Sequence, residues 1–321
     1  MKGKHRVVLQ NNRLHYEFEI RRNITIIQGD SATGKTTLIN MLRQYENLGD
    51  ASGVDVICDV PCRVLEGREW RLLLGSIAGS ILFLDEENAF IHTEEFAAAI
   101  RETDNYYVLI TRENLYNLPY SVEEIYGLRA TGKYQNTRRI YQQTYQIYSR
   151  REMLPVVPDV IVTEDSDSGY EFFHEVGEAH GMDCISAGGK SNLYKALTGI
   201  EAKSICVIAD GAAIGPEMNR LYEQAVRKGN VTLYLPESFE WLILQSGLID
   251  GKELLSILDA PESRIESSKF FSWERYFATL LSEQTQCSYL QYSKNHLNHV
   301  YLHGKNRDRI LQCIKGIRFE A

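Results

Sequence analysis

The sequence predicts an α/β protein with two domains, residues 1–153 and residues 158–321. Short apolar runs of the kind that form buried parallel strands recur along the chain, and helix-forming segments separate most of them. Pro155 and Pro158 interrupt the pattern between the two halves and therefore favour a boundary there. A chain of 321 residues is long enough for each half to bury its own core.

The composition fits a globular protein. Hydrophobic residues make up 44% of the chain and charged residues 24%, which suggests neither disorder nor a coiled coil. No apolar run approaches the roughly 18 residues of a membrane helix, and the basic start "MKGKHRVVLQ" lacks the apolar core of a signal peptide. We therefore expect a cytoplasmic protein without a membrane partner. The net charge of -8 does not favour a nucleic-acid binder, although a local basic strip matters more than the total.

The first domain opens with two segments that alternate apolar and polar residues, "RVVLQ" and "LHYEFEI". They predict an antiparallel ribbon ahead of the apolar strand "NITII". The segment "GDSATGKTT", residues 29–37, then separates this strand from the helical run "LINMLRQY". Its spacing matches the phosphate-binding loop pattern in full, and its flanks are the strand and helix that the pattern requires.

The residue types of this loop predict how it would bind a nucleotide. Gly29 and Gly34 allow a tight turn that directs backbone N–H groups at phosphates where a helix begins. Lys35 would reach the β and γ phosphates, Thr36 would offer its hydroxyl to Mg²⁺, and Thr37 is expected to face the helix packing. The predicted nucleotide-binding residues are Gly29, Asp30, Ser31, Ala32, Thr33, Gly34, Lys35, Thr36 and Thr37. The sequence has no "NKxD"-type base-recognition motif, so ATP is favoured over GTP.

Two further strands of the first domain carry polar residues at their ends, and "GVDVICDV" is another strand candidate. The buried strand in "SILFLDEE" runs into Asp85 and Glu86, which is the Walker B pattern. We expect Asp85 in the Mg²⁺ shell and Glu86 as the residue that orients or deprotonates the attacking water. The strand "YYVLI" is followed by Thr111 and Arg112. Arg112 would stabilise charge on the transferring phosphoryl group, or alternatively it only pairs with a nearby acid.

The stretch from 129 to 151 interleaves basic and aromatic residues. It predicts either a groove for single-stranded nucleic acid or a solvated face with tyrosines packed at the domain edge. Its members are Arg129, Lys133, Tyr134, Arg138, Arg139, Tyr141, Tyr145, Tyr148, Arg150 and Arg151.

Six cysteines are scattered along the chain without a paired metal spacing. Cys58 and Cys62 are the only close pair, and no second pair lies nearby. The sequence therefore predicts reduced, mostly structural thiols rather than a zinc site.

The second half alternates strands and helices, which predicts a parallel sheet with ligands at the carboxyl ends of its strands. Glu164 follows the strand "VIVT", Asp210 follows "ICVIA", and Glu240 lies at a helix start after "NVTLYL". These acids would hold a divalent cation, because Mg²⁺ prefers hard oxygen ligands. The alternative is a Rossmann-like sheet whose strand ends carry ordinary solvated carboxylates.

Both halves resemble known modules. The first resembles the ABC-type ATPase core, although "LLLGSIAGS" stands where an "LSGGQ" signature would be expected. Residues 158–250 resemble the Toprim domain, a Mg²⁺-binding fold, through Glu164, Asp210, Glu240 and the glycine segment "AGGKSNL". This resemblance implies Glu164 and Asp210 as catalytic metal ligands, with Glu240 as a further ligand.

Two positions depart from the Toprim pattern. Ala212 stands where the family has a second aspartate, and Ser168 replaces another acid, although Asp165 and Asp167 lie close enough to substitute. The sequence therefore predicts one metal rather than two.

The order of the two modules resembles OLD-family proteins and implies an ATPase whose nucleotide state controls a Toprim-like module acting on DNA. Phage defence and DNA repair are the processes that this resemblance suggests, and a homodimer or higher homo-oligomer would form through the ATPase domain. The alternative is a regulatory or scaffold protein whose Toprim-like domain is inactive. A small-molecule kinase is disfavoured, because no lid-like arginine cluster lies between the phosphate loop and "ILFLDEE".

Overall fold

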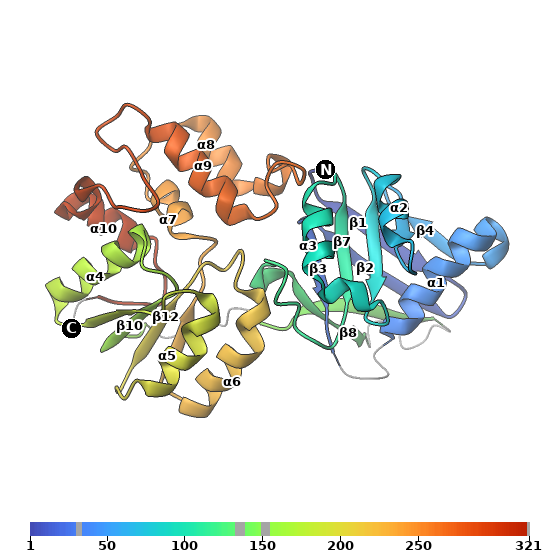
Figure 1. Cartoon of the computed structure of the whole chain (residues 1–321), viewed down its shortest axis with the longest axis horizontal. Helices are drawn as coiled ribbons and strands as arrows, with labels where there is room; N and C mark the ends of the chain where they lie inside the picture. The colour runs from blue at the N-terminus through green and yellow to red at the C-terminus, as the bar shows by residue number, and fades with distance from the viewer. Residues whose placement is uncertain (30–33, 132–138, 149–154, 320–321) are drawn as a thin grey trace. The chain divides into compact units, whose positions relative to one another are not determined.

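The computed structural model describes residues 1–29, 34–131, 139–148 and 155–319. The chain divides into two compact units. The first combines Met1–Ser149 with Ala260–Ser272, and the second combines Arg150–Asp259 with Trp273–Ala321. Each unit is an α/β structure with its own sheet, so the predicted α/β class is confirmed (Figure 1).

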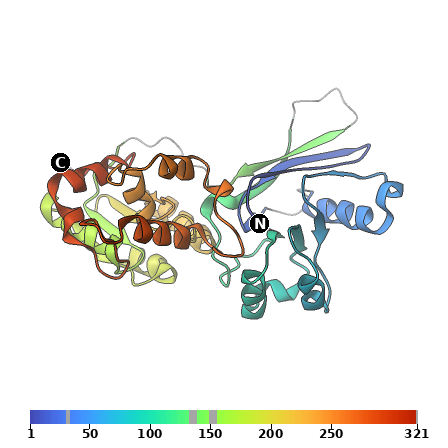
Figure 2. The same cartoon turned by 90° about the horizontal axis from the view of Figure 1, so that it is seen from above.

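The described part of the first unit forms a nine-stranded sheet in the order β4-β1-β2-β9-β8-β3-β7-β6-β5. The strands are β1 (His5–Gln10), β2 (Leu14–Ile20), β3 (Ile24–Ile27), β4 (Asp55–Ile57), β5 (Cys62–Val64), β6 (Ile81–Asp85), β7 (Tyr106–Ile110), β8 (Ile125–Ala130) and β9 (Ile140–Gln146). The sheet is mostly parallel, and the predicted antiparallel ribbon is the pair β1 and β2. Figure 2 shows this ribbon extending beside the β8–β9 hairpin.

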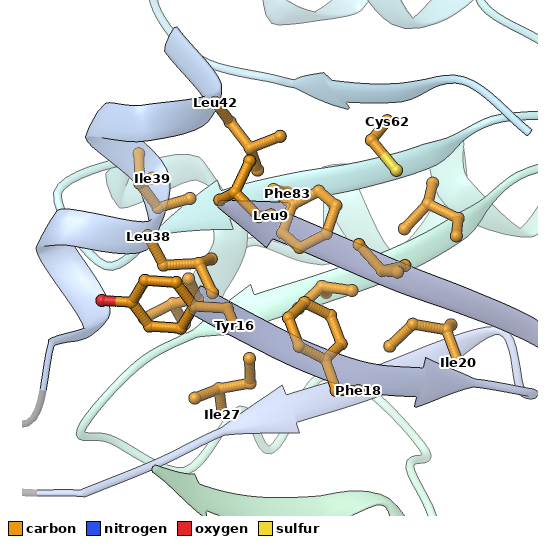
Figure 3. Packing of buried hydrophobic residues seen from close by; sticks show 14 of the residues in the cluster. Leu9, Tyr16, Phe18, Ile20, Ile27, Leu38, Ile39, Leu42, Cys62 and Phe83 are labelled. Carbon is orange, nitrogen blue, oxygen red and sulfur yellow. The ribbon is translucent and has the colours of Figure 1, made fainter. Parts of the chain in front are cut away.

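Helix α1 (Lys35–Leu48) covers one face of this sheet because its apolar side chains recur at helical spacing. Leu38, Ile39 and Leu42 pack against Phe18 of β2 and Phe83 of β6 in one buried cluster (Figure 3). Helices α2 (Trp70–Gly75) and α3 (Glu94–Arg101) belong to a second group of side chains. There the rings of Trp70, Phe90, Phe96 and Tyr107 contact one another.

Residues 260–272 belong to the first unit, whereas the sequence assigned them to the second domain. The backbone N–H of Gly3 donates to Glu262 at 2.7 Å, and that of Ser267 donates to Met1 at 2.8 Å. The buried Asn23 side chain donates to the carbonyls of Ser267 and Phe270, both at 3.3 Å. These contacts join residues more than two hundred positions apart, which no local sequence pattern reports.

The second unit has a fully parallel sheet in the order β11-β10-β12-β13. Its strands are β10 (Val160–Thr163), β11 (Asp183–Ser186), β12 (Ile205–Ile208) and β13 (Val231–Tyr234). Helix α4 (Ser168–His180) lies on one face, and helices α5 (Leu193–Gly199) and α6 (Met218–Lys228) lie together on the other (Figure 1). The remaining helices are α7 (Phe239–Gln245), α8 (Lys252–Asp259), α9 (Trp273–Thr285) and α10 (Gly304–Gln312).

The strand order of this sheet reverses beside β10. The connection through α4 leads to β11 on one side of β10, and the connection through α5 leads to β12 on the other. In open parallel sheets such a reversal leaves a crevice at the carboxyl ends of the two strands, where ligands bind.

Candidate functional site

The phosphate loop, residues 29–37, joins the central strand β3 to helix α1. Gly29 and Gly34 have φ angles of 142° and 91°, which side chains with a Cβ rarely adopt, and Gly34 is the N-cap of α1. The Tyr16 hydroxyl donates to the Gly34 carbonyl at 2.9 Å. A Cβ at Gly34 would approach this hydroxyl to 2.9 Å. Both the backbone conformation and this close contact therefore favour glycine. Asp30, Ser31, Ala32 and Thr33 lie outside the described residues.

The next three residues start helix α1. Lys35 is buried, and its ammonium donates to the Gly29 carbonyl across the loop. The Thr36 side chain is exposed, as a metal-binding hydroxyl would need to be. Thr37 is also exposed, so the expectation that it faces the helix packing is wrong.

The predicted acids lie at the same edge of the sheet as this loop. Strand β7 pairs in parallel with both β3 and β6, so the carboxyl ends of all three strands meet. Asp85 ends β6 and is 5% exposed. Burial raises the pKa of the Asp85 carboxyl, and the neighbouring charge of Glu87 raises it further.

Glu86 and Arg112 bind each other across β6 and β7. The Arg112 backbone N–H donates to Glu86 Oε2 at 2.9 Å, and Arg112 Nε lies 3.1 Å from Glu86 Oε1. Arg112 therefore pairs with a nearby acid, which is the alternative that the sequence left open. The Thr111 hydroxyl is buried and bonds only within its own turn, with the backbone of Glu113.

The basic and aromatic stretch forms part of the β8–β9 hairpin. The Arg129 guanidinium lies 5.1 Å from the centre of the Tyr145 ring, and that ring packs over Gly127, where a Cβ would come within 2.4 Å of it. Tyr141 packs against His15 with a centroid distance of 4.7 Å. Lys133, Tyr134, Arg138, Arg150 and Arg151 lie outside the described residues. The described tyrosines thus contact their own sheet.

In the second unit, the predicted acids lie in one pocket at the strand reversal beside β10. Glu164, Asp210 and Glu240 all line it, together with Asp165 and Asp167. The Asp210 backbone N–H donates to Glu164 Oε2 at 3.2 Å and so fixes the two strand ends together. Glu240 is 2% exposed, in the first turn of α7.

The electrostatics of this pocket favour a cation. Burial raises the pKa of Glu164 to about 7, and the negative charge of Glu274 adds to the shift. Burial also raises the pKa of Asp165 and, strongly, that of Asp210, on which the charges of Glu274, Glu164 and Glu240 act as well. Carboxylates that are both desolvated and close to one another are stabilised by a bound positive charge.

Sequence reasoning missed three residues of this pocket region. Lys294 lines the pocket and pairs with Glu274 of α9, with 2.5 Å between Nζ and Oε1. The Tyr292 hydroxyl donates to Glu240 Oε1 at 2.7 Å and lies 2.6 Å from the Ser168 hydroxyl. Tyr292 and Lys294 come more than fifty positions after β13, and a lone lysine and tyrosine give no local signal.

The two positions that depart from the Toprim pattern lie in different surroundings. Ser168 takes part in the Tyr292 bridge to Glu240. Ala212 is buried, and its backbone N–H donates to Glu237. A Cβ at the preceding Gly211 would meet the Leu235 carbonyl at 2.6 Å. This turn is therefore packed against the segment after β13, and Ala212 is not among the residues that line the pocket.

Side chains that could hold a metal ion lie at two places in the second unit. Within the described chain, His174, Glu175 and Glu178 of α4 are the group whose ligand atoms all lie within 4.8 Å of one another. Glu164, Asp210 and Glu240 do not form such a close group among the described residues. The α4 group lies on the surface, where acidic side chains commonly gather without a metal.

Comparison of the chain with protein-family models and with curated proteins finds no match. Among the described helices, none combines the length and apolar character that crossing a bilayer requires.

Proposed function

We propose that this chain binds and hydrolyses ATP, and that its nucleotide state controls a divalent-cation site in the second unit that acts on nucleic acid. The observation that carries the proposal is the shared edge of β3, β7 and β6. Lys35 follows the first of these strands, Arg112 follows the second, and Asp85 and Glu86 follow the third.

Each residue at this edge has a chemical role in the proposal. The Lys35 ammonium would exchange the Gly29 carbonyl for the β and γ phosphates of ATP. The Thr36 hydroxyl and the Asp85 carboxylate would hold Mg²⁺, which neutralises charge on the phosphates when bound. Glu86 would orient the attacking water, while Arg112 would position the Glu86 carboxylate and stabilise charge on the phosphoryl group.

The acidic pocket supports a phosphodiester reaction in the second unit. Glu164, Asp210 and Glu240 would hold Mg²⁺, with Asp165 or Asp167 as a further ligand. The bound cation would polarise a phosphodiester and lower the pKa of a water molecule. Lys294 lines the same pocket, so its ammonium would contact a phosphate oxygen there. An OLD-like protein that cleaves DNA in phage defence or repair matches this combination of sites.

A regulatory or scaffold role is the second candidate, and Ala212 favours it. The packed turn at Gly211 and Ala212 leaves no acid at that position, which removes a ligand that two-metal cleavage would use. In this case the acidic pocket would bind a cation or a partner without cleaving nucleic acid.

ATP turnover tests the first unit. Lys35→Ala should abolish nucleotide binding and hydrolysis, whereas Lys4→Ala, a half-exposed lysine paired with Glu19, should leave both unchanged. Hydrolysis by Lys35→Ala at the wild-type rate would contradict the proposal.

Cleavage of supercoiled plasmid and single-stranded DNA, with Mg²⁺ or Mn²⁺ and with or without ATP, tests the second unit. Glu164→Gln should lose cleavage, and Glu223→Gln, at an exposed glutamate of α6, is the matched control. If wild type hydrolyses ATP but cleaves neither substrate, the regulatory role becomes the better description.

A further inference from the structure

Three buried side chains at the acidic pocket are connected by hydrogen bonds, although they come from separate parts of the second unit. Ser168 begins helix α4, Glu240 lies in the first turn of α7, and Tyr292 follows α9. The Tyr292 hydroxyl donates to Glu240 Oε1 at 2.7 Å and lies 2.6 Å from the Ser168 hydroxyl. Ser168 and Glu240 line the pocket, whereas Tyr292 is not among the described residues that line it.

The hydrogen bonds of this chain of side chains run in one direction. A tyrosine hydroxyl carries one proton, and Tyr292 donates it to the Glu240 carboxylate. The contact between the two hydroxyls also needs a proton, so Ser168 donates to the Tyr292 oxygen. The Glu240 carboxylate is therefore the acceptor at the end of the chain.

Tyr292 is held in place by contacts outside the pocket. Its backbone N–H donates to the Thr285 hydroxyl at 3.0 Å, and its ring packs edge-on against Tyr301 with a centroid distance of 6.3 Å. Two residues further on, the Lys294 carbonyl accepts a hydrogen bond from the Ser168 backbone N–H at 2.9 Å. Backbone and side-chain contacts together thus fix the segment around Tyr292 to the start of α4.

The two oxygens of the Glu240 carboxylate therefore differ. Oε1 accepts the Tyr292 proton, whereas no hydrogen bond reaches Oε2 from the part of the chain that the structure describes. Glu240 is 2% exposed and lines the pocket with Glu164 and Asp210, so Oε2 is the oxygen left for a ligand there. A carboxylate oxygen in so buried a side chain is unfavourable unless a cation or a donor reaches it.

We propose that Tyr292 and Ser168 are positioning residues for Glu240, and that they hold one of its oxygens so that only Oε2 binds a divalent cation in the pocket. This inference rests on the proposed cation site of the second unit. Hydrogen bonds from behind orient a carboxylate that binds a metal, and their loss typically lowers metal affinity by about 10- to 100-fold. Ser168 thus contributes to the site through Tyr292, at a position where the Toprim pattern has an acid.

Mn²⁺ titration of the full chain without nucleotide tests this role, with the free ion followed by its electron paramagnetic resonance signal. Wild type should bind one equivalent whose affinity Glu164→Gln lowers, which assigns that ion to the pocket. Tyr292→Phe should weaken this binding by about 10- to 100-fold, because Glu240 loses its orienting donor. Ser168→Ala should weaken it by a smaller factor in the same direction.

Tyr301→Phe is the matched control. It also removes a buried hydroxyl, but one that donates to the Leu290 carbonyl and not to Glu240. It should therefore bind Mn²⁺ as wild type does, even where it is less stable. Circular dichroism establishes that each variant is folded, and if Tyr292→Phe is not, the comparison of Ser168→Ala with Tyr301→Phe decides the question.

A double-mutant cycle separates positioning from a merely structural role. In a Glu240→Gln background, Tyr292→Phe should cause no further loss of Mn²⁺ affinity, because the carboxylate that Tyr292 orients is gone. Additive losses, or wild-type affinity in Tyr292→Phe and Ser168→Ala, would overturn the positioning role and leave the cation site intact. A wild type that binds no Mn²⁺ in the pocket would refute the proposed site, and the positioning role with it.

Discussion

At the scale of single residues, Gly34 is constrained both by its backbone conformation and by a close neighbour. Gly34→Ala should cost about 1–2 kcal/mol for the left-handed backbone, and more for the contact with the Tyr16 hydroxyl. Urea unfolding would measure the loss, and ATP affinity should fall with it. Gly53→Ala is the matched control, because φ is 67° there and the space for a Cβ is open, so only the backbone cost remains.

Removal of the Tyr16 hydroxyl separates the cost of this contact from the cost of the backbone conformation. In a Tyr16→Phe background the Gly34→Ala substitution should cost less than in wild type, because the atom that its Cβ meets is gone. Equal losses of unfolding free energy in the two backgrounds would show that the left-handed backbone at Gly34 accounts for the whole cost.

Glu164 gives the second unit a stability that depends on pH. Its pKa in the folded protein is about 7, above its ordinary 4.5, so the folded state binds this proton more tightly than the unfolded state does. Below pH 4.5 the Glu164 carboxyl does not lower the free energy of unfolding, because it is protonated in both states. The penalty grows between pH 4.5 and 7, where the unfolded chain loses this proton while the folded protein keeps it, and it levels off at on the order of 3 kcal/mol above that range.

Thermal unfolding of Glu164→Gln across this pH range tests the prediction. The variant should be more stable than wild type at alkaline pH, and the difference should vanish near the lower limit of the window. Glu223→Gln, an exposed glutamate on α6, should follow wild type at every pH. A constant difference between Glu164→Gln and wild type would mean that packing, not ionisation, explains the change.

At the scale of elements, Tyr292 connects two helices that lie far apart in the sequence. Its hydroxyl bridges Ser168 at the start of α4 and Glu240 in α7, and all three side chains are buried. Tyr292→Phe should destabilise the second unit by about 1–3 kcal/mol, because polar groups would be left buried without this partner. Tyr289→Phe, 72% exposed, should change the urea midpoint little, and an equal shift in both variants would argue against the bridge.

The strands that sequence predicted best are those buried on both faces. Ile81–Leu84 and Val160–Thr163 are continuous apolar runs, and such runs define parallel strands whatever their partners. Strand β9 is polar and half-exposed, so its sequence left strand and helix equally open. The acids at strand ends were identified because topology gathers strand ends. Glu274 and Lys294 were missed because their approach to the pocket depends on the packing of α9 and the segment after it.

At the scale of the whole molecule, the first unit is not continuous in the sequence, because residues 260–272 belong to it. Asn23→Ala would remove the two hydrogen bonds that the Asn23 side chain donates to this segment. We expect faster tryptic cleavage at the exposed Arg264 and Lys269, because local release of the segment would present these sites.

Limited proteolysis with mass spectrometry measures this release. Asn12→Ala, at an exposed asparagine of the β1–β2 turn, should be cleaved at the wild-type rate. Unchanged cleavage in Asn23→Ala would mean that the backbone contacts of Gly3 and Met1, together with the bonds of the Ser267 side chain, suffice to hold the segment.

The return of residues 260–272 to the first unit also has a consequence for synthesis on the ribosome. The nascent chain emerges from its N-terminus, so all four strands of the second sheet have left the exit tunnel before Ser267 and Phe270 become available to Asn23. The first unit therefore cannot complete its contacts during translation of its own first 149 residues. An incomplete nascent chain that stops before residue 260 would carry residues 29–37 on an unfinished fold, and the complete first unit would arise only when synthesis of the second unit is nearly complete.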